Sequence, residues 1–141
     1  MSFYTDSYGR KHYIKEGYKR FHNMNAQYNY HRAYENDRYF DRYYFISYSS
    51  PICYAMYDSK YDSWHININW EKFDCSSSTS RQFNRWLSEN YIPLTLYDVK
   101  RLSKLVSYGP IVVSDYITVS FFNDKDMYRL CNIACNNYLC F

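Results

Sequence analysis

The sequence predicts an α+β fold in a single domain of 141 residues, with an antiparallel sheet of about four or five strands packed by two or three helices. Two observations predict it. Residues 43–70 contain three short apolar segments with strand periodicity, separated by turn residues. Two later segments carry apolar residues at helical spacing, each behind residues that commonly cap helices.

Three strands are expected at residues 43–48, 52–57 and 64–70. Ser and Pro residues break the first from the second, and a turn-rich segment precedes the third. Short links of this kind favour a meander. In the third strand apolar and polar side chains alternate, which is typical of a half-buried antiparallel strand. Its apolar face holds Trp64, Ile66, Ile68 and Trp70.

Two helices are expected next. The first begins with Thr79 and Gln82, which have the spacing of a capping box, and it ends at Asn90. Thr95 and Asp98 have the same spacing at the start of the second helix.

Strands and one more helix complete the predicted core. Residues 111–122 are rich in Val, Ile and Phe, and a turn near Ser114 and Asp115 would make them a hairpin. Asn123 is a suitable N-cap for a C-terminal helix.

The opening third of the chain differs from the rest in charge and composition. Residues 1–44 hold eight Lys or Arg against five Asp or Glu, together with ten of the 20 tyrosines, whereas residues 45–141 hold nine residues of each sign. The alternating charges favour a helix over residues 25–41, with residues 1–20 irregular. We expect residues 45–141 to form the α+β core and the basic, tyrosine-rich segment to be appended to it or to lie across it.

Several kinds of function are disfavoured. No run of 18 apolar residues and no apolar core of a signal peptide is present, so we expect a cytoplasmic protein. The chain contains three glycines and no phosphate-binding or dinucleotide-binding glycine motif. The Gly-x-Ser-x-Gly motif of serine hydrolases is absent, and a helix cap explains the Ser/Thr cluster at residues 75–80. We therefore expect a protein that is not an enzyme and carries no cofactor.

A zinc site is the one metal centre that the sequence allows. The chain has five cysteines, Cys53, Cys75, Cys131, Cys135 and Cys140. Cys131 and Cys135 would share a helical face with Cys140 close behind, and Cys75 or His65 could supply a fourth ligand. The tight Cys-x2-Cys pair of most structural zinc sites is absent, and Cys131 lies on an apolar stripe. We expect reduced thiols and no bound metal.

Tyrosine and arginine interleave between residues 28 and 42. Rings that stack on bases and cations that neutralise phosphates are used by single-strand-binding proteins, and the same two residue types dominate protein–protein hot spots. A third explanation is compositional, with Tyr replacing Leu and Phe in the core. The intermixed carboxylates favour a protein partner. The expected partner-binding residues are Tyr28, Tyr30, Arg32, Tyr34, Arg38, Tyr39 and Arg42, together with Lys100, Arg101 and Lys104 on the second helix.

A resemblance covers residues 43–92. The pattern is Ser47-Tyr48-Ser49-Ser50-Pro51-Ile52, then Trp70, then Ser78-Thr79-Ser80, then Trp86-Leu87-Ser88-Glu89-Asn90. It resembles small tyrosine-rich proteins of phages and mobile elements of low-GC Gram-positive bacteria, although Trp86 stands where that pattern has Phe. This pool of proteins includes the anti-CRISPR proteins directed against type II-A systems.

The resemblance implies a small inhibitor that works by binding. We expect a phage-encoded stoichiometric inhibitor of a host defence nuclease, with a type II-A CRISPR effector or its guide-RNA complex as the partner. The first alternative is a protein that binds RNA or single-stranded DNA. The second is a small structural or interaction protein of a phage.

Overall fold

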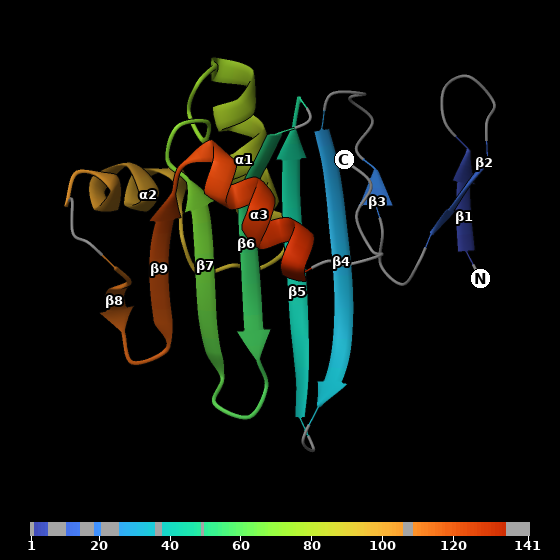
Figure 1. Ribbon diagram of the computed structural model, residues 1–141, viewed down its shortest axis with the longest axis horizontal. Helices are drawn as coiled ribbons and strands as arrows, with labels where there is room; N and C mark the ends of the chain where they lie inside the picture. The colour runs from blue at the N-terminus through green and yellow to red at the C-terminus, as the bar shows by residue number, and fades with distance from the viewer. Residues whose placement is uncertain are drawn as a thin grey trace.

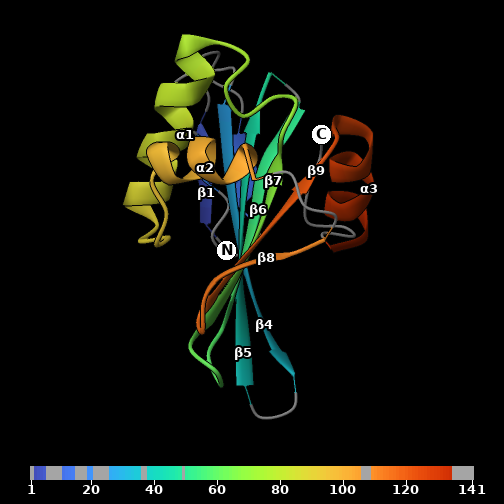
Figure 2. The same cartoon turned by 90° about the vertical axis from the view of Figure 1, so that its left-hand side faces the viewer.

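The computed structural model is an α+β fold in which one sheet lies between helices on its two faces (Figures 1 and 2). It describes residues 2–5, 11–14, 19–20, 26–35, 38–48, 50–105 and 109–134. The strands in this part of the chain are β1 (Ser2–Thr5), β2 (Lys11–Ile14), β3 (Lys19–Arg20), β4 (Ala26–Glu35), β5 (Arg38–Ser47), β6 (Ser50–Asp58), β7 (Ser63–Asn69), β8 (Ile111–Ser114) and β9 (Ile117–Phe122). The helices are α1 (Ser77–Glu89), α2 (Leu96–Ser103) and α3 (Asp124–Ala134).

Seven of the described strands form the sheet, in the order β3-β4-β5-β6-β7-β9-β8, while β1 pairs with β2 apart from it. Strands β4 to β7 are an antiparallel meander. Strand β9 then lies parallel to β7, and β8 pairs antiparallel with β9 at the edge. A parallel pair requires a long crossover connection, and the segment that carries α1 and α2 supplies it.

The predicted α+β class is confirmed, with more strands than expected. Both predicted helices, the β8–β9 hairpin and the C-terminal helix are present. Thr95 and Asp98 form the predicted capping box at α2, and the Asn123 side chain accepts a hydrogen bond from the Asp126 backbone N–H at the start of α3. The start of α1 differs from the prediction, because Ser76 is its N-cap.

The predicted helix over residues 25–41 is wrong, because β4 and β5 occupy this stretch. Its tyrosines alternate with other residues at period two, and tyrosine is a good strand former. The expected boundary between residues 44 and 45 falls inside β5, and Phe40, Tyr44 and Phe45 are buried. The core therefore includes part of the opening third, and the described residues of β1 and β2 are paired strands where irregular chain was expected.

Helices α1 and α2 cover one face of the sheet and α3 covers the other (Figure 2). The larger core lies under α1, where Phe45 of β5 stacks on Phe83 and Trp86, with ring centroids 6.0 Å and 5.7 Å apart. Ile66 and Ile68 join this core as predicted, whereas Trp70 follows the end of β7 and is 55% exposed. The smaller core lies under α3 and contains Tyr44, Tyr54, Met127 and Cys131.

The three helices cover only one half of the long strands. Strands β4 to β7 continue well past the helices to the end at which β4 leads into β5 and β6 leads into β7 (Figures 1 and 2). We call this part of β4–β7 the distal half. No helix among the described residues combines the length and the apolar character needed to span a membrane.

Candidate binding surface on the distal half of the sheet

The two faces of the distal half differ in chemistry, because successive residues of a strand point to opposite sides of a sheet. The face on the side of α1, here called the aromatic face, carries Tyr30, Arg32, Tyr34, Tyr39, Asp41, Tyr43, Tyr57 and Trp64. The face on the side of α3, here called the cationic face, carries His31, Arg38, Arg42, Asp58 and His65.

Aromatic rings form a continuous row across four strands of the aromatic face. The rings of Tyr30 and Tyr43 have centroids 5.0 Å apart, and those of Tyr43 and Trp64 are 5.6 Å apart. Tyr57 lies 5.1 Å from Trp64. These separations fall in the range in which tilted aromatic pairs attract one another, so the row is a preformed surface that needs little ordering when a partner binds.

An ion pair lies beside this row. Arg32 donates through Nε to Oδ1 of Asp41 at 2.7 Å and through Nη2 to Oδ2 at 3.1 Å, while its guanidinium lies 4.1 Å from the centre of the Tyr39 ring. The Tyr30 hydroxyl also donates to Asp41 Oδ1. Asp41 is buried and Arg32 is partly exposed, so the carboxylate depends on these donors in place of water.

The surroundings of Tyr30, Tyr43 and Tyr57 raise the pKa of these three phenols. Burial raises the pKa of the Tyr30 hydroxyl well above its ordinary value, and the hydrogen bond to Asp41 raises it further. Burial also raises the pKa of Tyr43. The hydrogen bond that the Tyr57 hydroxyl donates to Asp62, at 2.6 Å, raises the pKa of Tyr57 to about 12, with burial as the second cause. These groups act as hydrogen-bond donors at neutral pH and are poorly suited to acid–base catalysis.

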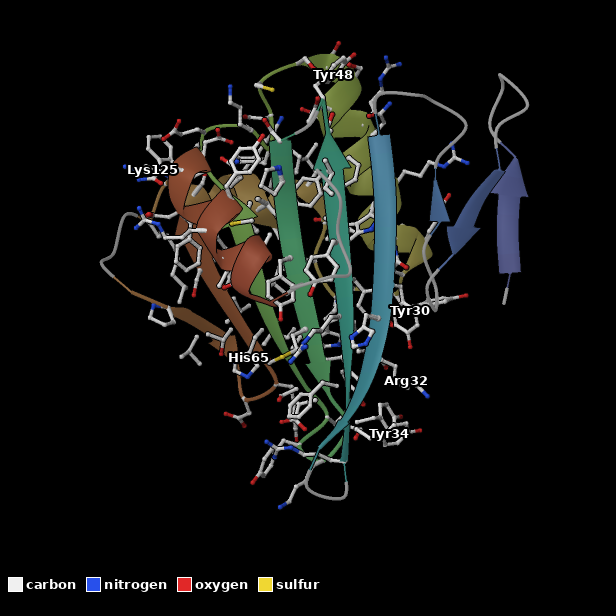
Figure 3. All side chains as sticks on the ribbon, turned by 45° about the vertical axis from the view of Figure 1, so that its right-hand side comes forward. Tyr30, Arg32, Tyr34, Tyr48, His65 and Lys125 are labelled. Carbon is white, nitrogen blue, oxygen red and sulfur yellow. The ribbon has the colours of Figure 1, made fainter. Side chains whose placement is uncertain are left out.

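Labelled side chains in Figure 3 show how far the aromatic face extends. Tyr30, Arg32 and Tyr34 follow one another along β4 toward its distal end, while Tyr48 lies at the opposite end of the strands. Tyr34 is 73% exposed and packs edge-on against Tyr39 at 5.9 Å. It is the most exposed tyrosine of the aromatic face and is well placed to make first contact with a partner.

The cationic face has fewer rings and more nitrogen donors. His31 pairs with Arg42 in the β4–β5 register, and Arg42 pairs with Met56, which pairs with His65. One row across the sheet therefore carries two histidines and an arginine. Arg38 lies four residues before Arg42 on β5, two steps further along this face toward the distal end, and its Nη1 atom is 3.6 Å from the buried carboxylate of Asp58.

The structure separates the residues that were predicted to bind a partner. Tyr30, Arg32, Tyr34 and Tyr39 lie on the aromatic face, whereas Arg38 and Arg42 lie on the cationic face. Tyr28 belongs to β4, and its side chain lies outside the described residues. Lys100, Arg101 and Lys104 are exposed on α2, which lies beside the other edge of the sheet (Figure 1).

Several residues of the two faces are not among the partner-binding residues predicted from the sequence. On the aromatic face these are Asp41, Tyr43, Tyr57 and Trp64, and on the cationic face they are His31, Asp58 and His65. The period-two recurrence of Tyr28, Tyr30 and Tyr34, with Arg32 between them, was a signal for a strand with one aromatic side. No local pattern indicates the register of β5, β6 and β7 that brings Tyr57 and Trp64 beside the tyrosines of β4 and β5.

The residues weighed as possible zinc ligands are not brought together among the residues that the structure describes. Cys131 is buried on α3, and Cys75 is exposed in the turn before α1, so the two lie on opposite sides of the sheet. Cys135 and Cys140 fall outside the described residues. Within the described ranges no group of three or more His, Cys, Asp and Glu side chains is placed to hold a metal ion.

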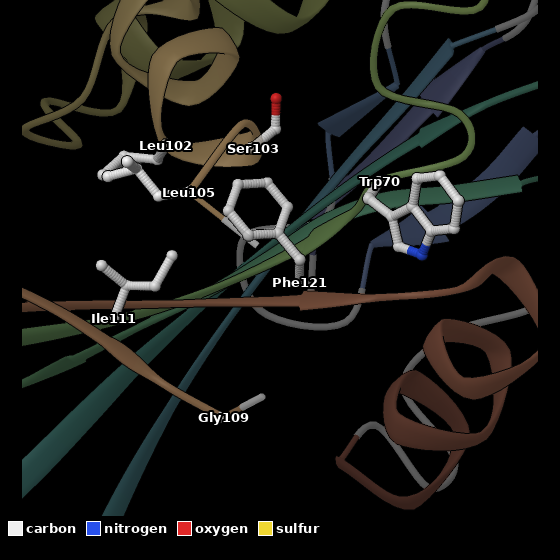
Figure 4. A pocket seen from close by; sticks show the side chains of 7 residues that line it. All are labelled: Trp70, Leu102, Ser103, Leu105, Gly109, Ile111 and Phe121. Atoms are coloured by element: carbon white, nitrogen blue, oxygen red, sulfur yellow. The ribbon is translucent and has the colours of Figure 1, made fainter. Parts of the chain in front are cut away.

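One apolar pocket of about 280 Å³ lies away from the distal half, between α2 and the β8–β9 hairpin (Figure 4). It is lined by Trp70, Leu102, Ser103, Leu105, Gly109, Ile111 and Phe121. Among the described lining residues, the Ser103 hydroxyl and the Trp70 indole N–H are the side-chain hydrogen-bonding groups, so this lining suits an apolar group better than a charged one.

Comparison of the chain with protein-family models, with curated proteins and with solved structures finds no match. The function is therefore inferred from the chemistry of the two faces of the distal half, and the likeness of residues 43–92 to phage proteins stays a resemblance.

Proposed function

We propose that the protein is a non-catalytic inhibitor that binds a protein partner through the aromatic face. The partner that we propose is a nuclease of a bacterial defence system, with a type II-A CRISPR effector or its guide-RNA complex as the first candidate. The single observation that carries the proposal is the continuous ring row from Tyr30 through Tyr43 to Trp64 and Tyr57 on a part of the sheet that no described helix covers.

The residue types of this face are those that provide most of the binding free energy in protein interfaces. Tyr, Trp and Arg are enriched at hot spots, and a tyrosine brings a large contact area with only two side-chain torsions to order. Arg32 is already fixed by Asp41 and by stacking on Tyr39. Little conformational entropy is lost when such a surface binds.

The charge of the aromatic face favours a protein over a nucleic acid. Among the described side chains of this face, Arg32 is the one cation, and its charge is neutralised by the Asp41 carboxylate; at the rim, the Asp62 carboxylate accepts a hydrogen bond from Tyr57. A phosphate backbone would be repelled by this balance, whereas a cationic protein surface would be attracted. Surfaces on which proteins bind nucleic acid are cationic, so a nuclease offers a patch of suitable chemistry.

The resemblance of residues 43–92 supports the choice of a nuclease of CRISPR defence. The pool of phage proteins that it points to includes inhibitors that act by occupying the effector. An inhibitor of this kind needs a rigid contact surface and no active site, which agrees with an aromatic face on which the pKa values of Tyr30 and Tyr57 are raised.

DNA cleavage by a purified type II-A effector, assembled with its guide RNA, tests the proposal. The amount of cleaved DNA should fall linearly with added protein and reach its minimum at about one protein per effector, because a stoichiometric inhibitor acts by occupying each effector molecule. A matched pull-down from host lysate should recover the same nuclease with and without ribonuclease treatment. Full cleavage at a large excess of protein would rule out this nuclease as the partner.

A further inference from the structure

We propose that the cationic face is a second binding site, which takes the phosphate backbone of a single-stranded nucleic acid, with Arg42 at its centre. The aromatic face and the cationic face are opposite sides of the same strands. This inference does not depend on the protein partner of the aromatic face, and it can hold or fail independently.

Arg42 has no ion-pair partner among the residues that the structure describes. Its Nε atom is buried and has no hydrogen bond. An unsatisfied buried donor destabilises the folded state, and does so more strongly when the group is charged. Such a group in a folded protein often marks the place of a water molecule or an ion.

The neighbours of Arg42 are also nitrogen donors. His31 lies directly opposite it on β4, and His65 stands in the same row on β7, beyond Met56. His65 is exposed. Strands lie about 4.8 Å apart, so His65 is roughly 10 Å from Arg42 across the sheet.

Cations and a ring lie further along this face, toward the distal end of the strands. Nη1 of Arg38 lies 3.6 Å from Oδ2 of Asp58, so the charge of Arg38 is largely balanced by this carboxylate. The exposed ring of Tyr61 lies 5.4 Å from the Arg38 guanidinium and 5.5 Å from the Lys60 ammonium. An exposed ring beside cations is the arrangement on which a base stacks.

An extended strand of nucleic acid suits this face better than a free phosphate ion. A small anion is normally held in a cradle of several converging donors, as at a helix N-terminus or a backbone nest. Here the donors of Arg42 and His65 and the ring of Tyr61 are spread over the surface of β5, β7 and the turn between β6 and β7. A polymer with repeating phosphates and bases can contact all of them at once.

Fluorescence anisotropy with labelled single strands of about 15 nucleotides, one of RNA and one of DNA, tests the proposal. Arg42→Ala should weaken binding about tenfold and reduce the slope of log K against log salt by about 0.7, the value for one lost phosphate contact on a single strand. Arg81→Ala, which removes the same charge from the exposed side of α1, should bind like the wild type. Tyr34→Ala should also bind the strands like the wild type, because Tyr34 lies on the aromatic face.

Arg42→Lys separates a charge effect from a folding effect. It keeps the positive charge, so it should restore most of the binding, and thermal unfolding of each variant shows whether the fold is intact. Equal affinity of wild type and Arg42→Ala for both strands, or no binding by the wild type, would overturn the proposal. Binding of inorganic phosphate that depends on Arg42, with no binding of either strand, would also overturn it by identifying a site for a free anion.

Discussion

Arg32 on β4 and Asp41 on β5 form a bidentate ion pair, in which both carboxylate oxygens accept hydrogen bonds from the same guanidinium, at 2.7 Å and 3.1 Å. The side chain of Asp41 is 6% exposed and that of Arg32 is 40% exposed. The pair therefore fixes the register of the two strands that carry most of the aromatic face. It also means that Arg32, which was expected to meet a partner, is already engaged within the protein.

Replacing Arg32 by Ala should destabilise the fold. The buried carboxylate of Asp41 would keep only the Tyr30 hydroxyl as a side-chain donor, and a buried charge that loses its partner costs about 3 kcal/mol or somewhat less at a partly exposed site. Urea unfolding measures the change. The matched control is Arg85→Ala, which breaks an exposed i,i+4 pair with Glu89 and should cost at most about 0.5 kcal/mol.

The double variant Arg32→Ala/Asp41→Ala should be more stable than the sum of the two single losses predicts. Removing both charges leaves no uncompensated carboxylate, so the two effects are coupled. Strict additivity of the two losses would show that the pair does not contribute as a unit.

Trp86 should be one of the largest single contributors to stability. It is 1% exposed and packs on Phe45 and Phe83 beneath the sheet. Trp86→Ala should lower the free energy of unfolding by about 3–5 kcal/mol, since it removes a large buried ring and leaves a cavity. Tyr97→Ala on α2, where the ring is 73% exposed, is the control and should leave the unfolding midpoint nearly unchanged.

Stability should decline at alkaline pH because of the aromatic face. The pKa of Tyr57 is raised to about 12 by its hydrogen bond to Asp62, and the pKa of Tyr30 is raised by burial and by Asp41. A raised pKa favours the neutral phenol in the folded state. This stabilisation is complete below about pH 10, the ordinary value for tyrosine, and is lost as the pH rises through the folded-state pKa.

Urea unfolding at a series of pH values above about 9 measures this decline. Tyr57→Phe keeps the ring but removes the ionisable hydroxyl, so its unfolding free energy should fall less steeply between about pH 10 and 12 than that of the wild type. Equal slopes for the two proteins would contradict the assignment of a raised pKa to Tyr57.

The thiols should differ sharply in reactivity. Burial raises the pKa of the Cys53 thiol, Cys131 is 1% exposed, and Cys75 is exposed before α1. Because the thiolate is the reactive form, iodoacetamide should modify Cys75 in the folded protein and reach Cys53 and Cys131 only after unfolding. Mass mapping of the alkylated peptides gives the order of modification among Cys53, Cys75 and Cys131. Early labelling of Cys53 would contradict its placement in the core.

The part of the fold that could be predicted is the part with a single consistent period. The alternation from Trp64 to Ile68 identified β7 and the face that packs on α1, and the Thr95–Asp98 spacing located the start of α2. Trp70 was placed on that face by extending the alternation past the end of the strand. The start of α1 was ambiguous because consecutive Ser and Thr residues all suit an N-cap, and Thr79 instead bonds to Ser47 inside the protein.

The site was harder to predict because it depends on pairing between strands. The residues of β4 contain a tyrosine pattern that suits a strand and a charge pattern that suits a solvated helix. The two patterns predict different structures, and the helix predicted from the charges is wrong. Once β4 is a strand, Tyr30 and His31 must lie on opposite faces. The contact of Tyr43 with Trp64 joins residues of non-adjacent strands, and no local signal encodes it.

The central claim is that the aromatic face binds a protein partner, and the affinity of two matched variants for the effector–guide complex tests it most directly. Tyr34 and Tyr97 are both 73% exposed, but only Tyr34 lies on the aromatic face. Calorimetric titration should show that Tyr34→Ala binds about tenfold more weakly than the wild type, which corresponds to about 1.4 kcal/mol, while Tyr97→Ala binds equally well. Equal affinities for the two variants, in a complex that the wild type does bind, would contradict the claim.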